Sequence, residues 1–270
     1  MTRSPLIIVT DLDGTLLDQN TYSYQASLPA IERLRSLRIP LILCSSKTLG
    51  EILPLWQELA LQSPFMTENG GAVYWPPRYF PFAVPGSTVR DGMEIIELGI
   101  SVAVLRRALQ EAAQECAVKI SSFGTMELNE IAKLTRLTLE QAALAAEREY
   151  DEPFFVEKGN RNELFESLRA KGFKVTRGDR FFHLTGGHDK GEAVKLLLDH
   201  YRRWYGSIMS VGLGNSANDL PLFCEVDRPV LVRNSDASYD SEILKRMPRI
   251  HCTQRSGPDG WREAVEQFLF

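Results

Sequence analysis

The sequence has no long apolar stretch, no closely spaced cysteine pair and no excess of basic residues. None of its hydrophobic runs approaches the roughly 20 residues that span a bilayer, and its start does not have the pattern of a secretion signal. The four cysteines form no CxxC pair, which argues against a structural zinc site or a redox pair and favours free, buried thiols. Lysine and arginine are scattered, and the net charge is −4. We therefore expect a cytoplasmic protein that binds neither membranes nor nucleic acid.

The motifs of two common phosphate-handling classes are also missing. A nucleotide-binding P-loop needs the pattern GxxxxGK[ST], which does not occur. A cysteine-based phosphatase needs an arginine six positions after its nucleophilic cysteine. The residues six positions after the four cysteines are Gly50, Ser122, Val230 and Pro258. Neither class fits this chain.

The sequence does contain short, β-branched apolar runs that alternate with helical patterns. Four such runs are Leu6 to Val9, Leu41 to Leu43, Ile208 to Val211 and Pro229 to Val232. They suit strands buried on both faces, and their alternation with helices predicts an α/β fold with a doubly wound parallel sheet. A proline-rich break near residues 76–86 precedes a stretch of mixed character. We expect a Rossmann-like core formed by residues 1–84 and 187–270, with residues 85–186 as an inserted α+β cap domain.

Two carboxylates, Asp11 and Asp13, stand at the end of the first apolar run, directly before Gly14. Residues two apart on an extended segment project to the same side, and a glycine allows a sharp turn behind them. Their repulsion would raise the pKa of one carboxyl group unless a proton or a divalent cation relieved it. Because open parallel sheets bind ligands beyond the carboxyl ends of their strands, the sequence predicts a site here.

Further polar groups follow other predicted strands or open a predicted helix. They are Ser45, Ser46 and Lys47 after the strand at Leu41, Lys190 at a helix start, and the glycine-rich segment 212–219. A hydroxyl, an ammonium, helix N-terminal amides and hard oxygen ligands together can hold a phosphate group and a metal ion. We therefore expect a phosphate site at this edge of the sheet.

The motifs DLDGT, CSS, DKG and GLGNSAND occur in an order and spacing that resemble the haloacid dehalogenase superfamily of phosphohydrolases. The long insert and the motif ENGGA resemble its cap-bearing sugar-phosphatase branch. The resemblance implies that Asp11 is the nucleophile, that Asp13 is the general acid and base, and that Ser45 and Lys190 hold the transferred phosphoryl group. It also implies a Mg²⁺ ion held by Asp11, Asp13, Asn215 and Asp219.

Four more segments, SSKT, EREYDEPF, RFFHLTGGHDKG and GPDGW, resemble the mannosyl-3-phosphoglycerate phosphatase family. The implied substrate is a hexosyl-3-phosphoglycerate, cleaved to hexosylglycerate and phosphate by a monomer or weak homodimer. The expected substrate-binding residues are Leu12, Ser46, Lys47, Asn69, Arg177, Arg180, His183 and Arg255. For the basic side chains among them, a solvated surface position is an equal alternative, and His183 could equally be a structural histidine.

One position departs from the superfamily pattern, because Asn215 stands where a metal-binding aspartate is usual. A neutral amide oxygen is a weaker magnesium ligand than a carboxylate, so we expect weaker metal binding. The sequence leaves open a variant that works with less charge, a change that slows turnover, and a loss of catalysis. It also leaves open a phosphomutase, a phosphatase of sucrose phosphate or of a hexose phosphate, and a non-catalytic binder of a phosphorylated ligand.

Overall fold

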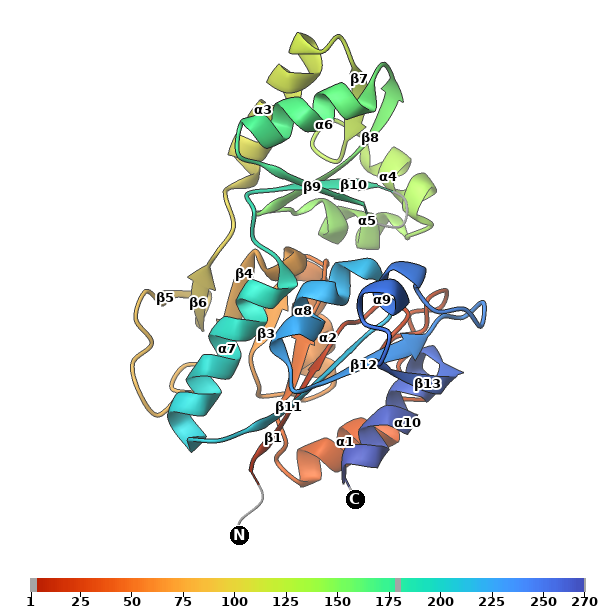
Figure 1. Cartoon of the computed structure of the whole chain (residues 1–270). Helices are drawn as coiled ribbons and strands as arrows, with labels where there is room; N and C mark the ends of the chain where they lie inside the picture. The colour runs from red at the N-terminus through yellow and green to blue at the C-terminus, as the bar shows by residue number, and fades with distance from the viewer. Residues whose placement is uncertain (1–3, 178–180, 270) are drawn as a thin grey trace.

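The computed structural model describes residues 4–177 and 181–269, and Figure 1 shows two layered units, the smaller of which lies above the larger. The larger unit contains a nine-stranded sheet in the order β13-β12-β11-β1-β2-β3-β4-β6-β5. Its strands are β1 (Leu6–Thr10), β2 (Leu41–Cys44), β3 (Phe65–Thr67), β4 (Ala72–Trp75), β5 (Thr88–Arg90), β6 (Met93–Glu97), β11 (Met209–Gly214), β12 (Arg228–Arg233) and β13 (His251–Ser256). The strands from β13 to β3 are parallel, and those from β4 to β5 continue the sheet antiparallel. The prediction of a doubly wound α/β fold is confirmed.

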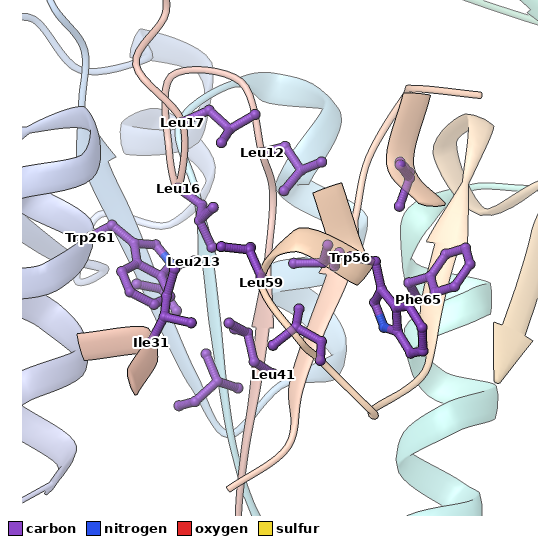
Figure 2. Close-up of a cluster of buried hydrophobic side chains, with 14 of the residues drawn as sticks. Leu12, Leu16, Leu17, Ile31, Leu41, Trp56, Leu59, Phe65, Leu213 and Trp261 are labelled. Carbon is purple, nitrogen blue, oxygen red and sulfur yellow. The ribbon is translucent and has the colours of Figure 1, made fainter. Parts of the chain in front are cut away.

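Helices cover both faces of this sheet, as the buried apolar runs require. They are α1 (Leu28–Ser36), α2 (Leu49–Glu58), α7 (Lys190–Tyr205), α8 (Leu220–Glu225), α9 (Ser241–Arg246) and α10 (Gly257–Leu269), with the short 3₁₀ helices η1 (Glu68–Gly70) and η2 (Ala217–Asp219). On β1, Ile8 packs with the side of α1, α2 and α10, whereas Ile7 and Val9 pack with the side of α7, α8 and α9. Figure 2 shows the first of these clusters, in which Trp56 of α2 and Trp261 of α10 lie on either side of leucines such as Leu41 of β2 and Leu16 of the loop after β1.

The smaller unit is built on a four-stranded antiparallel sheet in the order β7-β8-β10-β9. Its elements are α3 (Val102–Glu115), β7 (Lys119–Ser122), α4 (Leu128–Thr135), α5 (Leu139–Ala146), β8 (Asp151–Lys158), α6 (Arg161–Ala170), β9 (Lys174–Arg177) and β10 (Phe182–Thr185). Leu105 of α3 and Leu164 of α6 bury one face of this sheet against Phe154 and Leu184. Figure 1 shows this unit above the end of the parallel strands, with α3 and α6 on its far side.

The strands β5 and β6 lie inside the range expected for the cap, yet they belong to the large sheet. Ile96 of β6 pairs with Val73 of β4, and Val89 of β5 pairs with Glu94 of β6. The expected start of the insert at residue 85 is therefore too early for the sheet pairing that is observed. We propose a division near residue 99, where the chain leaves β6 for α3.

Composition led to two further expectations, about membranes and about thiols. Within the described ranges, no helix has the length and apolar character needed to cross a membrane. The four cysteines are free, as expected, but only Cys44 is buried, and Cys224 is exposed. The expectation of buried thiols is therefore wrong for Cys224.

Candidate active site

Lys190 lies between two carboxylates at the carboxyl end of the parallel strands. Its Nζ atom is 2.6 Å from Oδ1 of Asp11 and 2.6 Å from Oδ1 of Asp219. Asp11 directly follows β1, and Asp219 ends the 3₁₀ helix that follows β11, the neighbour of β1 in the sheet. Lys190 is the first residue of α7, and the Asp189 side chain caps that helix by accepting from the backbone N–H of Gly191. Three elements far apart in sequence thus place their polar groups together.

Burial and the neighbouring charges shift the pKa values of Asp11 and Lys190. Burial raises the pKa of Asp11 to about 7, and the nearby Asp219 carboxylate adds to the rise, while Lys190 opposes it. Burial alone would lower the pKa of Lys190, but Asp11 and Asp219 raise it above its usual value, so the ammonium stays charged. A further cation near Asp11 would favour its ionised form.

Asp13 faces a second lysine. Its Oδ2 atom is 3.1 Å from Nζ of Lys47, which also lies 3.6 Å from Oε1 of Glu51 and over the ring of Tyr22. Burial would lower the pKa of Lys47, but the two acids raise it, so this lysine carries a charge next to Asp13. The Asp13 Oδ1 atom is buried and has no hydrogen-bond partner within the described part of the chain. That oxygen is available to a ligand.

The loop after β2 presents a buried hydroxyl. Ser45 is 1% exposed, and its Oγ atom accepts from the backbone N–H of Lys47 at 3.2 Å. Its carbonyl accepts from the backbone N–H of Asn69 at 2.9 Å. Asn69 has a left-handed backbone, with φ 59°, and its Oδ1 atom accepts from Nδ2 of Asn218 at 3.5 Å. The loops after β2, β3 and β11 therefore meet at one edge.

Asp219 stabilises the glycine-rich loop after β11 through hydrogen bonds to the loop's own backbone. The Asp219 Oδ2 atom accepts from the backbone N–H of Asn215 at 2.9 Å and from that of Ser216 at 3.1 Å. A Cβ atom on Gly214 would lie 2.5 Å from Cγ of Asp219, so only glycine fits there. Asp219 therefore supports both the loop, through Oδ2, and Lys190, through Oδ1.

The side chain of Asn215 reaches toward the acidic loop. Its Nδ2 atom donates to Oδ1 of Asn234 at 2.9 Å, which leaves its own Oδ1 atom as an acceptor for another group. A Cβ atom on Gly14, which has φ +75°, would lie 2.4 Å from Nδ2 of Asn215. Glycine is therefore needed at position 14 both for the backbone conformation and for this close approach.

The oxygen donors at this edge fit a hard divalent cation with few charged ligands. No group of three or more His, Cys, Asp or Glu side chains in the described ranges could hold a metal ion. The donors expected from the sequence are instead mixed in type, because the Asp11 carboxylate would be joined by neutral oxygens of Asp13 and Asn215. Carboxylate and carbonyl oxygens suit Mg²⁺, which keeps several waters and takes few protein ligands.

The structure brings some of the expected substrate-binding residues to this site and places others elsewhere. Ser46, Lys47 and Asn69 lie in the loops just described. The Leu12 side chain is buried in the core, so only its backbone could face a ligand. Arg255 is exposed near the end of β13, the edge strand, two residues before Gly257, where a Cβ atom would lie 3.9 Å from the carbonyl oxygen of Gly14. Arg180 lies outside the described residues.

Strand alternation separates the two cap residues Arg177 and His183. Arg177 lies directly opposite Phe182 in the sheet, so the two side chains share one face. Phe182 packs with α3 and α6, which cover the face turned away from the larger unit. His183 lies on the opposite face, and its Nδ1 atom is 2.7 Å from Oδ2 of the buried Asp151. Of these two expected contacts, only His183 stands on the face that the cap turns toward the larger unit.

Two further functional candidates, Glu68 and Arg148, are not indicated by the sequence motifs. The Glu68 carboxylate accepts from three successive backbone N–H groups of the cap, those of residues 149–151. Arg148 donates from Nη1 to the carbonyl of Ser46 at 2.6 Å. Both residues lie in quoted segments, ENGGA and EREYDEPF, but their charge alone does not predict a contact between the two units.

The fold and the site together are those of a capped haloacid dehalogenase-like hydrolase. A family model described as haloacid dehalogenase-like hydrolase matches residues 8–80. Among solved structures, a phosphatase of the haloalkanoate enzyme superfamily from Bacteroides thetaiotaomicron superposes with a TM-score of 0.70. It is 17% identical and the match covers 99% of this chain and 96% of that chain, so it bears on the fold alone.

Sequence relatives narrow the assignment further. A glucosyl-3-phosphoglycerate/mannosyl-3-phosphoglycerate phosphatase from Methanococcoides burtonii is 38% identical over 265 residues, which is 97% of this chain and 97% of that protein. A mannosyl-3-phosphoglycerate phosphatase from Pyrococcus furiosus is 39% identical over 90% of this chain and 99% of that protein. The chain belongs to the haloacid dehalogenase-like phosphatase family that contains these two relatives.

Proposed function

We propose that this protein hydrolyses a hexosyl-3-phosphoglycerate, with mannose or glucose as the hexose, to hexosylglycerate and inorganic phosphate. The observation that carries the proposal is the identity of 38–39% to relatives with that named activity over 90–97% of the chain. This match is not confined to the catalytic motifs. It includes the cap, whose residues we expect to contact the substrate and determine which esters bind.

The geometry supports a two-step phosphoryl transfer. In the first step an Asp11 oxygen attacks the phosphorus atom, and the bond from phosphorus to the glycerate oxygen breaks as Asp13 donates a proton to that oxygen. In the second step Asp13 takes a proton from water, which attacks the phosphorus atom and releases Asp11. In this proposal Lys190, which lies 2.6 Å from Asp11, neutralises charge on both the nucleophile and the phosphoryl group. In this proposal the Ser45 hydroxyl donates to a phosphoryl oxygen.

We further propose that Mg²⁺ binds beside Asp11, held by its carboxylate, by the Asp13 main-chain carbonyl and by Asn215, with Asp219 supporting the loop. When bound, the ion supplies positive charge that favours the ionised nucleophile and a more electrophilic phosphorus atom. Lys47, 3.1 Å from Asp13, places a second positive charge at this edge of the sheet, where the phosphate group would bind.

The remaining substrate contacts are proposed from the loops and from the near face of the cap. Ser46, Lys47 and Asn69 lie on the larger unit, and His183 lies on β10 of the smaller unit. Lysine and histidine suit the substrate carboxylate and hydroxyl groups. We also propose a cytoplasmic protein that acts on a small molecule as a monomer or weak homodimer, without nucleic-acid or membrane partners.

A substrate panel tests this function directly. Phosphate release would be measured with Mg²⁺ for mannosyl- and glucosyl-3-phosphoglycerate beside sucrose phosphate and simple hexose phosphates. We expect the highest kcat/KM for a hexosyl-3-phosphoglycerate. A clear preference for sucrose phosphate or a hexose phosphate would reject the proposed substrate and leave the phosphatase chemistry intact.

Asn215 favours one second candidate, a binder of phosphorylated ligands with little or no turnover. The neutral amide stands where a charged metal ligand would bind the cation more tightly. If neither the natural chain nor Asn215→Asp releases phosphate from any ester in the panel, the binding role replaces the enzymatic one.

A further inference from the structure

Arg148 is a cap residue whose guanidinium contacts the loop after β2 in the larger unit. We call this loop, residues 45–48, the phosphate-binding loop. It follows α5 and is 8% exposed. Its Nε atom donates to the carbonyl of Ala145 at 2.8 Å, and its Nη1 atom donates to the carbonyl of Ser46 at 2.6 Å and lies 3.7 Å from Oδ2 of Asp151. Its carbon atom Cζ also lies 5.7 Å from the ring centre of Phe123. These contacts fix the guanidinium in one place.

The Ser46 carbonyl, which accepts from Arg148, belongs to the peptide group whose N–H contacts Ser45. The Ser46 carbonyl and the Lys47 N–H are the two ends of one planar unit, and they point in opposite directions. That N–H donates to Oγ of Ser45 at 3.2 Å. A rotation of this peptide plane would therefore move the hydrogen bond that orients the Ser45 hydroxyl. A charged donor on the carbonyl also polarises the peptide and strengthens the bond that its N–H donates.

We propose that Arg148 is a positioning residue, which aims the Ser45 hydroxyl at the phosphoryl group by fixing the Ser46–Lys47 peptide from the cap. The proposal rests on the proposed phosphatase function. Ser45 is aligned only when the cap lies against the larger unit, so the phosphate-binding loop is complete only in the docked arrangement. The Thr48 hydroxyl donates to the carbonyl of Leu144 at 2.8 Å and holds the same two segments together one turn away.

The test compares Arg148→Ala with Arg106→Ala, a matched change in the cap. Arg106 pairs with the buried Glu152 at 2.8 Å, and among the described residues it has no hydrogen bond or ion pair with the loop after β2. Both variants would be assayed on a hexosyl-3-phosphoglycerate and on p-nitrophenyl phosphate, which has no sugar or glycerate. We expect Arg148→Ala to lose about tenfold in kcat, or about 1.4 kcal/mol, by the same factor on both esters. Arg106→Ala should keep its kcat.

Chemical rescue adds a readout that a purely structural role would not move. Arg148 lines an open cavity of about 580 Å³, so a small cation can reach its place. Millimolar guanidinium should restore part of the kcat of Arg148→Ala and leave that of Arg106→Ala unchanged. An unchanged kcat in Arg148→Ala, an equal loss in Arg106→Ala, or a loss confined to the sugar ester would each overturn the proposal.

Amide hydrogen exchange separates this proposal from the proposed function. In a segment covering residues 44–49, the Lys47 amide should exchange faster in Arg148→Ala than in the natural chain or in Arg106→Ala. Equal exchange in all three proteins would overturn the positioning role. A natural chain that hydrolyses no ester would instead overturn the phosphatase function, and the exchange result would still decide whether Arg148 fixes this peptide.

Discussion

The Nζ atom of Lys190 lies 2.6 Å from Oδ1 of Asp219, and neither side chain is exposed to solvent. Because Asp219 also accepts two backbone N–H groups of the glycine-rich loop, this ion pair links the start of α7 to the loop after β11. The same ammonium holds Asp11, so one buried cation fixes the positions of three segments. The site is therefore also a structural centre of the larger unit.

Removal of that cation should destabilise the fold. Lys190→Met leaves Asp11 and Asp219 as buried carboxylates without their partner, and breaking a buried ion pair typically costs about 3–5 kcal/mol. We expect a fall of that size in the free energy of unfolding at pH 8, measured with a chemical denaturant. Lys195→Met, which removes an exposed pair with Asp199 on the same helix, should change it little. Equal stability of the two variants would contradict the central place of Lys190.

Asn215→Asp should tighten the binding of the divalent cation. The change replaces a neutral oxygen with a charged one at a position beside Gly14 and the acidic loop. We expect about a tenfold lower Mg²⁺ concentration for half-maximal activity, or about 1.4 kcal/mol. Asn218→Asp adds the same charge at an exposed position of the same loop and serves as the control. A shift of the same size in both variants would point to a general electrostatic effect and not to a ligand at position 215.

Glu68 should make the stability of the protein depend on pH. Burial raises the pKa of this carboxyl group from 4.5 to about 7, against the opposing effects of Arg148 and of the amide it accepts from Tyr150. A raised pKa means that the folded state favours the protonated form, so this contribution is complete below pH 4.5 and is lost as the pH rises to about 7.

Glu68→Gln removes that titration and isolates its effect. Relative to this variant, the natural chain should lose unfolding free energy on the order of 3 kcal/mol as the pH rises from about 4 to about 8. Denaturant unfolding at a series of pH values measures the difference. A difference that stays constant with pH would show that Glu68 does not titrate in this range.

His183 should contribute to substrate choice and not to the chemical step. Its Nδ1 atom is fixed by Asp151 at 2.7 Å, which orients the other ring nitrogen on the cap face that looks toward the larger unit. We expect His183→Ala to raise the KM of a hexosyl-3-phosphoglycerate about tenfold and to leave kcat/KM for p-nitrophenyl phosphate within about twofold. An equal effect on both esters would place His183 among residues that support the phosphate site.

The sequence predicted the parts of the site that follow strands. Asp11, Asp13, Ser45, Lys190 and the glycine-rich loop all stand at the carboxyl ends of parallel strands or at a helix start, where the position is set by local pattern. Parallel sheets bring such ends to one edge, so the sequence pattern alone suffices to place these residues together.

Contacts that depend on how the two units dock could not be predicted in this way. The contact of Arg148 with Ser46 joins positions that are 102 residues apart and carries no periodic signal. The edge that we propose for the cap also depends on strand pairing, because the proline-rich break near residue 85 precedes β5 and β6, which belong to the large sheet. Arg177 was expected at the substrate because of its charge, but the register of β9 with β10 places it on the opposite face.

The most direct measurement is a search for the phosphoryl group on the protein itself. The enzyme would be mixed with a hexosyl-3-phosphoglycerate and Mg²⁺, quenched in acid within the first turnover, and digested for mass spectrometry, with Asp11→Asn as the control. We predict a phosphoryl group on Asp11 in the natural chain, and in Asp11→Asn an unmodified peptide, a folded protein and no turnover. Release of phosphate by the natural chain with Asp11 unmodified, or turnover by Asp11→Asn near the natural rate, would contradict the assignment of Asp11 as the nucleophile.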